Sequence, residues 1–252
     1  MIEIFILSII QGLTEFLPIS SSSHLIIISN FLNFENDSLS MNVSLHIGSF
    51  IAICFYFRND IFNFIKNKIL FLRIIISSIP VMLVGYLLIK LNLIIYLRDI
   101  KIIAWTTIIF GFVLLLSDKF ETKKKIDKNF TLKSAIFIGC FQILSLIPGV
   151  SRSGITISAA RFLKFDRYDS AQISFLLSVP TLAAVSFFGL TNLVENNNII
   201  FTKINLFSIF LSFLFSYITI KFFLNYIKKF TLIAFVIYRI ILGSVLLIVA
   251  YL

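Results

Sequence analysis

Charged side chains are scarce in this 252-residue chain, since Asp, Glu, Lys and Arg together make up 13% of it. A soluble domain has about 25%. Polar stretches long enough to fold alone are also missing, because the longest, 117–133 and 192–203, have the length of loops. These absences exclude a soluble protein and a separate soluble domain. With 59% hydrophobic residues, the chain is expected to be an all-α polytopic membrane protein.

Cysteine is equally scarce, and the first 57 residues contain no Lys or Arg. Cys54 and Cys140 lie within apolar segments, so we expect packed thiols with no disulfide or metal role. Glu3 stands where a cleavable signal peptide would carry a basic residue. The first apolar segment is therefore expected to remain in the mature protein.

Six apolar runs are each about long enough to cross a bilayer as a helix: 41–57, 69–89, 100–117, 172–192, 204–224 and 231–252. Two further apolar regions, 1–40 and 132–168, are interrupted at their centres by Pro, Gly and Ser. Each half of such a region is too short to span comfortably. We therefore predict six full transmembrane helices and two re-entrant helix–loop–helix hairpins, whose irregular backbone must be surrounded by protein or line a cavity.

The net charge of +10 arises from basic residues in short connections, so topology explains it better than a nucleic-acid partner does. Sixteen basic residues fall on one predicted side and four on the other. The sixteen are Arg58, Lys66, Lys68, Arg73, six lysines within 119–133, Arg161, Lys164, Arg167, Lys221, Lys228 and Lys229. This side is expected to be cytoplasmic, so both termini are expected to face outward.

A hairpin followed by three spans occurs twice in the single membrane domain, 1–252. The first copy covers 1–117 and the second 132–252, with a cytoplasmic loop at 118–131 between them. Because three is odd, the second copy must be upside down, which makes an inverted-topology repeat. The sequence echo is weak: Gln11 and Pro18 in the first hairpin resemble Gln142 and Pro148 in the second.

Arg152 lies in the break of the second hairpin, where a permanent charge at membrane depth needs an anionic partner. Hydroxyls and glycine surround it, and guanidinium, hydroxyl and backbone N–H groups together suit phosphate oxygens. We predict a phosphate site at Ser151, Arg152, Ser153, Gly154 and Thr156.

The first hairpin offers Gln11 and Glu15, which share a helix face, and then a serine run and His24. Where the two breaks meet, a carboxylate, hydroxyls and an imidazole would face the phosphate site. Structural alternatives stay open. Glu15 and Arg152 could form only a salt bridge, serines often act only as helix caps, and His24 could be structural. His46 is expected to hydrogen-bond across helices, and Arg239 to pair with a carbonyl or an acid.

These motifs resemble undecaprenyl-diphosphate phosphatases of the UppP/BacA type over essentially the full length. The family's (E/Q)xxxE motif is present as Gln11–Glu15, and its PGxSRSxxT motif is complete at 148–156. Further echoes are Phe16–His24, Phe175–Pro180 and Tyr238–Gly243.

The resemblance implies a hydrolase that converts undecaprenyl diphosphate in the bilayer to undecaprenyl phosphate and inorganic phosphate. This recycles the lipid carrier for peptidoglycan and envelope glycans, and the family is associated with bacitracin resistance. It also implies an active site open to the periplasmic or outer side and a divalent cation, Mg or Ca, held by Glu15 with Gln11 as a second candidate ligand. A homodimer is a candidate assembly.

Carried over by position, the expected catalytic residues are Glu15, Ser21, His24 and Arg152. The nucleophile is left open between Ser21, His24 and water. A transporter is the rival hypothesis, because inverted repeats with broken helices are typical of secondary carriers. A structural scaffold would leave Arg152 and Glu15 unexplained.

Overall fold

The computed structural model describes residues 2–32, 39–64, 67–195 and 203–252. This part of the chain is almost entirely helical and contains no strand, only an isolated bridge between Lys124 and Phe165. Its elements are α1 (Ile2–Thr14), α2 (Ser21–Leu32), α3 (Leu39–Tyr56), α4 (Arg58–Phe64), α5 (Lys68–Lys90), η1 (Leu93–Arg98), α6 (Ile100–Asp118), α7 (Ile126–Asn129), α8 (Leu132–Ile143), η2 (Leu144–Leu146), α9 (Arg152–Phe162), α10 (Arg167–Glu195), α11 (Lys203–Ile227) and α12 (Ile233–Tyr251).

Five helices in the described residues are long and apolar enough to cross a membrane: α5, α6, α10, α11 and α12. They confirm five of the six expected spans. The sixth, 41–57, is α3, which is shorter and carries buried hydroxyls at Ser44 and Ser49. Because α3 packs against α10 and α11, it need not be apolar on every face. The sixth expected span therefore corresponds to α3, a slightly shorter apolar helix of 18 residues.

Both interrupted regions form helix–loop–helix hairpins, as predicted. Their arms are short: 13 residues in α1, 12 in α2, 12 in α8 and 11 in α9. Even with the three residues of η2 added to α8, no arm exceeds about 24 Å, whereas the hydrocarbon core of a bilayer is about 30 Å thick. Each hairpin can therefore enter the membrane and turn back within it.

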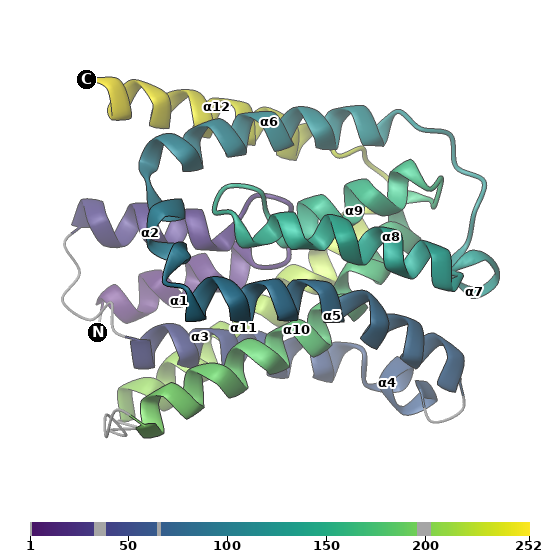
Figure 1. Cartoon of the computed structure of the whole chain (residues 1–252), viewed down its shortest axis with the longest axis horizontal. Coiled ribbons are helices and arrows are strands. Elements are labelled where there is room, and N and C mark those ends of the chain that lie inside the picture. The colour runs from purple at the N-terminus through teal and green to yellow at the C-terminus, as the bar shows by residue number, and fades with distance from the viewer. Residues whose placement is uncertain (1, 33–38, 65–66, 196–202) are drawn as a thin grey trace.

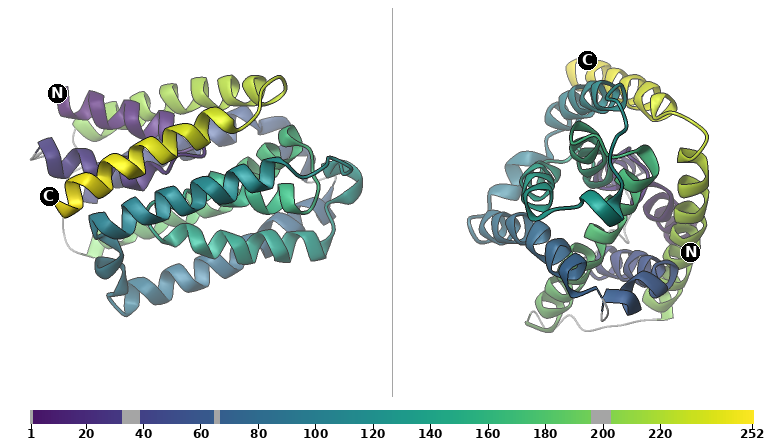
Figure 2. Two further views of the ribbon diagram at one scale, coloured as in Figure 1. Left: turned by 90° about the horizontal axis from the view of Figure 1, so that it is seen from above. Right: turned by 90° about the vertical axis from the view of Figure 1, so that its right-hand side faces the viewer.

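The two hairpins approach from opposite ends of the molecule, and their loops meet near its middle (Figure 1). Both chain ends lie at the end from which α1 starts, whereas α4 and α7, with their basic neighbours, lie at the other. A view along the long axis shows the long helices standing around the hairpins (Figure 2, right). An inverted repeat requires this arrangement, and the repeat boundaries 1–117 and 132–252 stay a prediction.

A serine with positive φ ends each hairpin loop. Ser20 has φ 74° and precedes α2, and Ser151 has φ 70° and precedes α9. Each lies nine residues after a glutamine, Gln11 or Gln142. The two loops therefore correspond without a gap, and Pro148 is not the counterpart of Pro18, as the sequence echo suggested. A side chain in the left-handed region costs about 1–2 kcal/mol, so the surrounding structure must impose this conformation.

Arg239 on α12 holds the two loops together. Its side chain is fully buried and donates to the carbonyl oxygens of Pro18 (3.1 Å), Val150 (3.0 Å) and Gly149 (2.7 Å), and through Nε to Thr107 O (3.2 Å). The expectation that Arg239 pairs with a carbonyl or an acid is confirmed. These bonds satisfy loop carbonyls that no helix can satisfy at this depth.

Gly149 is the residue that allows the second loop to approach α6. It has φ 94°, and a Cβ atom there would lie 2.0 Å from Thr106 Oγ1. The same Oγ1 donates to Pro148 O at 2.6 Å. The loop is thus fixed against α6 on one side and by Arg239 on the other.

The basic end of the bundle is held by Asp118, at the end of α6. Its carboxylate accepts from Arg167 Nε (2.6 Å) and from Leu232 N (3.2 Å). Buried Arg161, at the end of α9, donates to Asp118 O at 2.9 Å. This cluster joins α6, α9, α10 and α12. The end of α9 that lies away from the loop is therefore anchored to three long helices.

Candidate active site

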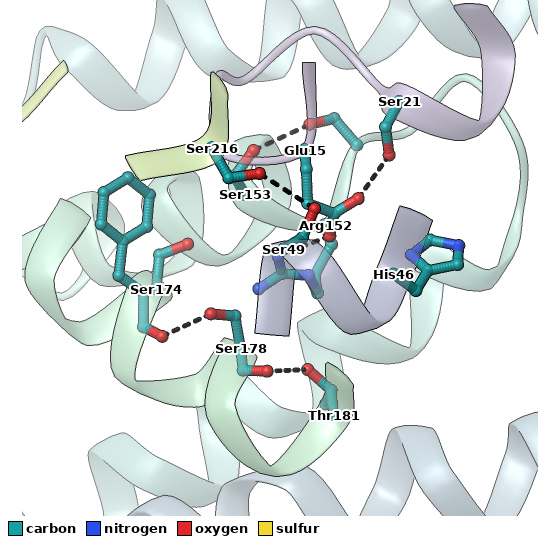
Figure 3. A network of polar contacts seen from close by, with 12 residues as sticks. Glu15, Ser21, His46, Ser49, Arg152, Ser153, Ser174, Ser178, Thr181 and Ser216 are labelled. Atoms are coloured by element: carbon teal, nitrogen blue, oxygen red, sulfur yellow. Dashed lines mark hydrogen bonds and ion pairs between the residues drawn. The ribbon is translucent and has the colours of Figure 1, made fainter. Parts of the chain in front are cut away.

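The carboxylate of Glu15 joins the two hairpins where their loops meet. Oε1 accepts from Arg152 Nη2 at 2.9 Å, and Oε2 accepts from Ser21 Oγ at 2.7 Å (Figure 3). Gln11 Nε2 donates to the same Oε2 at 3.1 Å. The expected meeting of an acid, a hydroxyl and a guanidinium is thus present in the structure.

The local fold explains how these side chains come together. Glu15 follows the last turn of α1, Ser21 is the first residue of α2, and Arg152 is the first residue of α9. Two helix N-termini therefore face the meeting point, and each carries a partial positive charge that favours an anion. Four-residue spacing places Gln11 beside Glu15 on one helix face.

The ion pair between Glu15 and Arg152 is the one that a purely structural interpretation would require. It accounts for the carboxylate but not for the whole guanidinium, because Arg152 Nη1 is buried without a hydrogen-bond partner among the described residues. A buried N–H of a charged group is costly to leave unpaired. Half of this side chain is thus available for an anion.

A cavity of about 260 Å³ lies beside the ion pair. Polar residues of the loops and of α3 line it, including Glu15, Ser21, His46 and Arg152. Apolar side chains of α5, η2 and α10 line it as well: Val81, Leu146, Leu182 and Val185. This volume can hold a diphosphate group, and its mixed polar and apolar lining suits an amphiphilic ligand.

The predicted phosphate-binding residues divide into two groups. Ser151 lines the cavity with Arg152, and its Oγ caps Gly154 N at 3.1 Å. Ser153 Oγ instead donates to Leu17 O (2.7 Å), and Thr156 Oγ1 to Ser174 Oγ (2.7 Å). These last two hydroxyls tie the second hairpin to the first and to α10.

The two histidines lie at different distances from the reacting groups. His24 Nδ1 lies 2.6 Å from Ser20 O, and Nε2 lies 2.6 Å from Tyr238 Oη. Neither ring nitrogen of His24 contacts Glu15 or Ser21 through any hydrogen bond between described residues. His46 lines the cavity, and its Nδ1 lies 3.1 Å from Gln11 Nε2. The cross-helix bond expected of His46 is confirmed.

His24 is connected to the site through the backbone. Its bond to Ser20 O supports the strained residue that directly precedes Ser21. The geometry therefore gives His24 a positioning role, and a direct catalytic role stays a prediction.

Sequence reasoning did not assign three polar residues to the site, although they line the cavity: Gln142, Ser145 and Thr181. Gln142 carried a signal, since an amide within the apolar segment 135–147 has no obvious reason to be there. Ser145 and Thr181 could not be found in this way, because a helix in a membrane readily accommodates a hydroxyl by bonding to its own backbone.

Metal binding was tested against the side chains that the structure describes. Among them no three His, Cys, Asp or Glu side chains form a cluster, so a cage built by the protein alone is not present there. Glu15 and Gln11 offer hard oxygen ligands, and Gln11 Oε1 is buried without a described partner. Mg²⁺ typically takes one or two carboxylates and completes its shell with substrate phosphates and water. The residues therefore fit a cation held mainly by a diphosphate.

Comparison with known proteins gives a consistent result. Residues 4–245 match the family described as "Bacitracin resistance protein BacA". A protein of Pelagibacter ubique named undecaprenyl-diphosphatase is 51% identical over 99% of this chain and 98% of its own length. Proteins with the same name from Jannaschia sp. and Saccharophagus degradans are 36% and 40% identical, covering 98% and 94% of this chain and the same shares of their own lengths.

Proposed function

The chain belongs to the BacA family, and from this premise we propose that it hydrolyses undecaprenyl diphosphate to undecaprenyl phosphate and inorganic phosphate. It is a multi-pass membrane enzyme of the hydrolase class. The reaction returns the lipid carrier to peptidoglycan and envelope glycan synthesis and is the basis of the link with bacitracin resistance. The observation that carries this proposal is the half-satisfied guanidinium of Arg152, which lies beside Glu15 and Ser21 at a cavity lined partly by apolar side chains.

In the proposed mechanism, Arg152 binds the terminal phosphate through Nη1 and keeps Nη2 on Glu15. Its charge stabilises the negative charge that develops on the transferring phosphoryl group. The N-terminus of α9 and Ser151 contribute further donors. The apolar side chains of the cavity hold the first part of the isoprenoid chain, so the diphosphate enters with its terminal phosphate towards the loops.

Ser21 is the nucleophile in this proposal, and its support is the 2.7 Å bond to Glu15. Glu15 takes the proton from Oγ as Oγ attacks the terminal phosphorus. The bond between phosphorus and the bridging oxygen breaks, and undecaprenyl phosphate leaves. Water then attacks the phosphorus of the phosphoserine. The bond between phosphorus and Ser21 Oγ breaks, inorganic phosphate leaves, and the Ser21 hydroxyl is restored. Direct attack by a water molecule held by Glu15 is the alternative.

A divalent cation, Mg or Ca, is part of the proposal, with Glu15 and Gln11 Oε1 as its protein ligands beside the diphosphate. When bound, it would neutralise phosphate charge. We also propose that the enzyme lies in the bacterial inner membrane with its basic loops in the cytoplasm and both termini and the active site towards the outer side. Assembly as a homodimer stays a prediction.

The direct test is orthophosphate release from undecaprenyl diphosphate by the detergent-purified protein, with and without a chelator. We expect one orthophosphate per lipid, and loss of most of the activity when the chelator removes the cation. Transfer of the lipid or an anion across the membrane of proteoliposomes without any hydrolysis would instead support the rival hypothesis of a transporter. Full activity in the presence of excess chelator would contradict the proposal that the reaction needs a divalent cation.

Replacing Ser21 with alanine distinguishes covalent from direct hydrolysis. We expect kcat to fall at least about 100-fold, because loss of an activated nucleophile usually costs more than that. Orthophosphate release measures the effect, and Ser186→Ala, which removes a buried hydroxyl outside the cavity lining, is the control. A Ser21→Ala variant that keeps more than about a tenth of the wild-type kcat would exclude a phosphoserine intermediate.

A further inference from the structure

Gln142 on α8 carries a fully buried amide. Neither its Nε2 nor its Oε1 has a hydrogen-bond partner among the described residues, and the side chain is 0% exposed. It lines the same cavity as Glu15 and Arg152. A buried amide without partners destabilises a fold, so its presence here indicates a ligand that completes its hydrogen bonds.

The counterpart of Gln142 in the other hairpin explains why its amide is unpaired. Gln11 and Gln142 stand at the same distance before Ser20 and Ser151, the two strained serines. Gln11 binds an acid four residues later, at Glu15. The residue four positions after Gln142 is Leu146. The first hairpin therefore supplies an acceptor for the Nε2 of its glutamine, whereas the second hairpin supplies none for Gln142.

The surroundings of Gln142 indicate which part of the substrate it meets. The neighbouring Leu146, one turn along the chain, is one of the apolar side chains that line the cavity, together with Val81 and Leu182. The reacting groups come instead from the loops, where Glu15 and Arg152 pair. Gln142 thus lines one cavity together with apolar side chains that suit an isoprenoid chain and with the groups that suit a terminal phosphate.

A lipid diphosphate has the same order of parts: an apolar chain, a phosphate ester and then a terminal phosphate. We infer that Gln142 is a substrate-binding residue that donates from Nε2 to the lipid-linked phosphate, which becomes the leaving group. This inference rests on the proposed function. A neutral amide binds this phosphate without adding a second permanent cation, so the monophosphate product is held less firmly than an arginine would hold it.

The test compares Gln142→Leu with the wild-type full-length protein in detergent. Besides kcat/KM for undecaprenyl diphosphate, it measures inhibition by undecaprenyl phosphate and by orthophosphate. We expect kcat/KM to fall about 10- to 100-fold, as for loss of one hydrogen bond to a charged group. Inhibition by the lipid monophosphate should weaken by a similar factor, while inhibition by orthophosphate, which binds at Arg152, should change less than about twofold.

Two further variants keep the test decisive. Ser8→Ala removes another buried, unpartnered polar atom that does not line the cavity, and its kcat/KM should stay within about twofold of wild type. Gln142→Glu preserves the volume and places an acid against the phosphate, so it should also weaken inhibition by the monophosphate. If Gln142→Leu does not fold, the same inhibition measurements are made on Gln142→Glu instead.

Unchanged kcat/KM in Gln142→Leu would overturn the inference. So would weaker inhibition by orthophosphate together with unchanged inhibition by the monophosphate, because that pattern places Gln142 at the terminal phosphate. A wild-type protein that releases no orthophosphate would refute the proposed function itself. An active wild type with an unaffected Gln142→Leu variant would refute only the role of Gln142.

Discussion

Replacing Arg152 with alanine is expected to lower kcat/KM for orthophosphate release by about a thousandfold or more, while the protein still folds and inserts. Guanidinium groups that stabilise a transferring phosphoryl group contribute effects of about 10³ to 10⁵. The fold should survive because Glu15 keeps hydrogen bonds from Ser21 and Gln11 after the guanidinium is removed. Phosphate release and a thermal unfolding curve in detergent measure the two halves of this prediction.

Arg152→Lys is the matched variant. Lysine keeps the charge but cannot hold Glu15 with one nitrogen and a phosphate with another in a fixed plane. It should recover only part of the lost activity. Near-wild-type phosphate release from Arg152→Ala would refute the proposed phosphate site, even if the protein is an active phosphatase.

Replacing Arg239 with methionine is expected to destabilise the protein by several kcal/mol, because a buried polar group left without a partner costs about 1–3 kcal/mol. The guanidinium is 0% exposed and donates to four carbonyl oxygens, on both hairpin loops and on α6. Methionine fills much of the volume but leaves these oxygens without donors. Chemical denaturation in mixed micelles measures the free energy of unfolding.

The exposed Arg98 provides the control, since Arg98→Met removes a charge at the surface of the bundle and should change stability by no more than about 0.5 kcal/mol. Equal stability of Arg239→Met and wild type would contradict a structural role for Arg239. Loss of activity at unchanged stability would indicate substrate contact instead. The structure argues against that outcome, because Nε, Nη1 and Nη2 all bind backbone oxygens.

The sequence allowed the hairpins and most spans to be predicted because both rest on hydropathy and on backbone chemistry. Pro18 and Pro148 break apolar regions, and a broken helix at membrane depth must turn back or line a cavity. The α3 segment was predicted as a span because it is apolar on average. Its buried Ser49 hydroxyl bonds to Ser212 and Ser216 on α11, which no local pattern reveals.

The candidate site was predictable at Glu15 and Arg152, since a charge in an apolar chain must find a partner. The choice between His24 and His46 was not, because it depends on which way each helix faces after packing. The gapless correspondence of the two loops also needed the backbone, since the positive φ of Ser20 and Ser151 leaves no mark in a run of serines. Gln142 indicated a ligand only once the structure showed that no described residue forms a hydrogen bond with its side-chain amide.

The central claim is that the two hairpin loops meet, so that Arg152 of one pairs with Glu15 of the other. A double-mutant cycle with Glu15→Gln, Arg152→Gln and the double variant tests it, with the free energy of unfolding in mixed micelles as the measurement. Residues in contact are expected to show a coupling free energy of at least about 1 kcal/mol. If the two single effects instead sum to the double effect within about 0.5 kcal/mol, the loops do not meet through this pair and the proposed site is wrong.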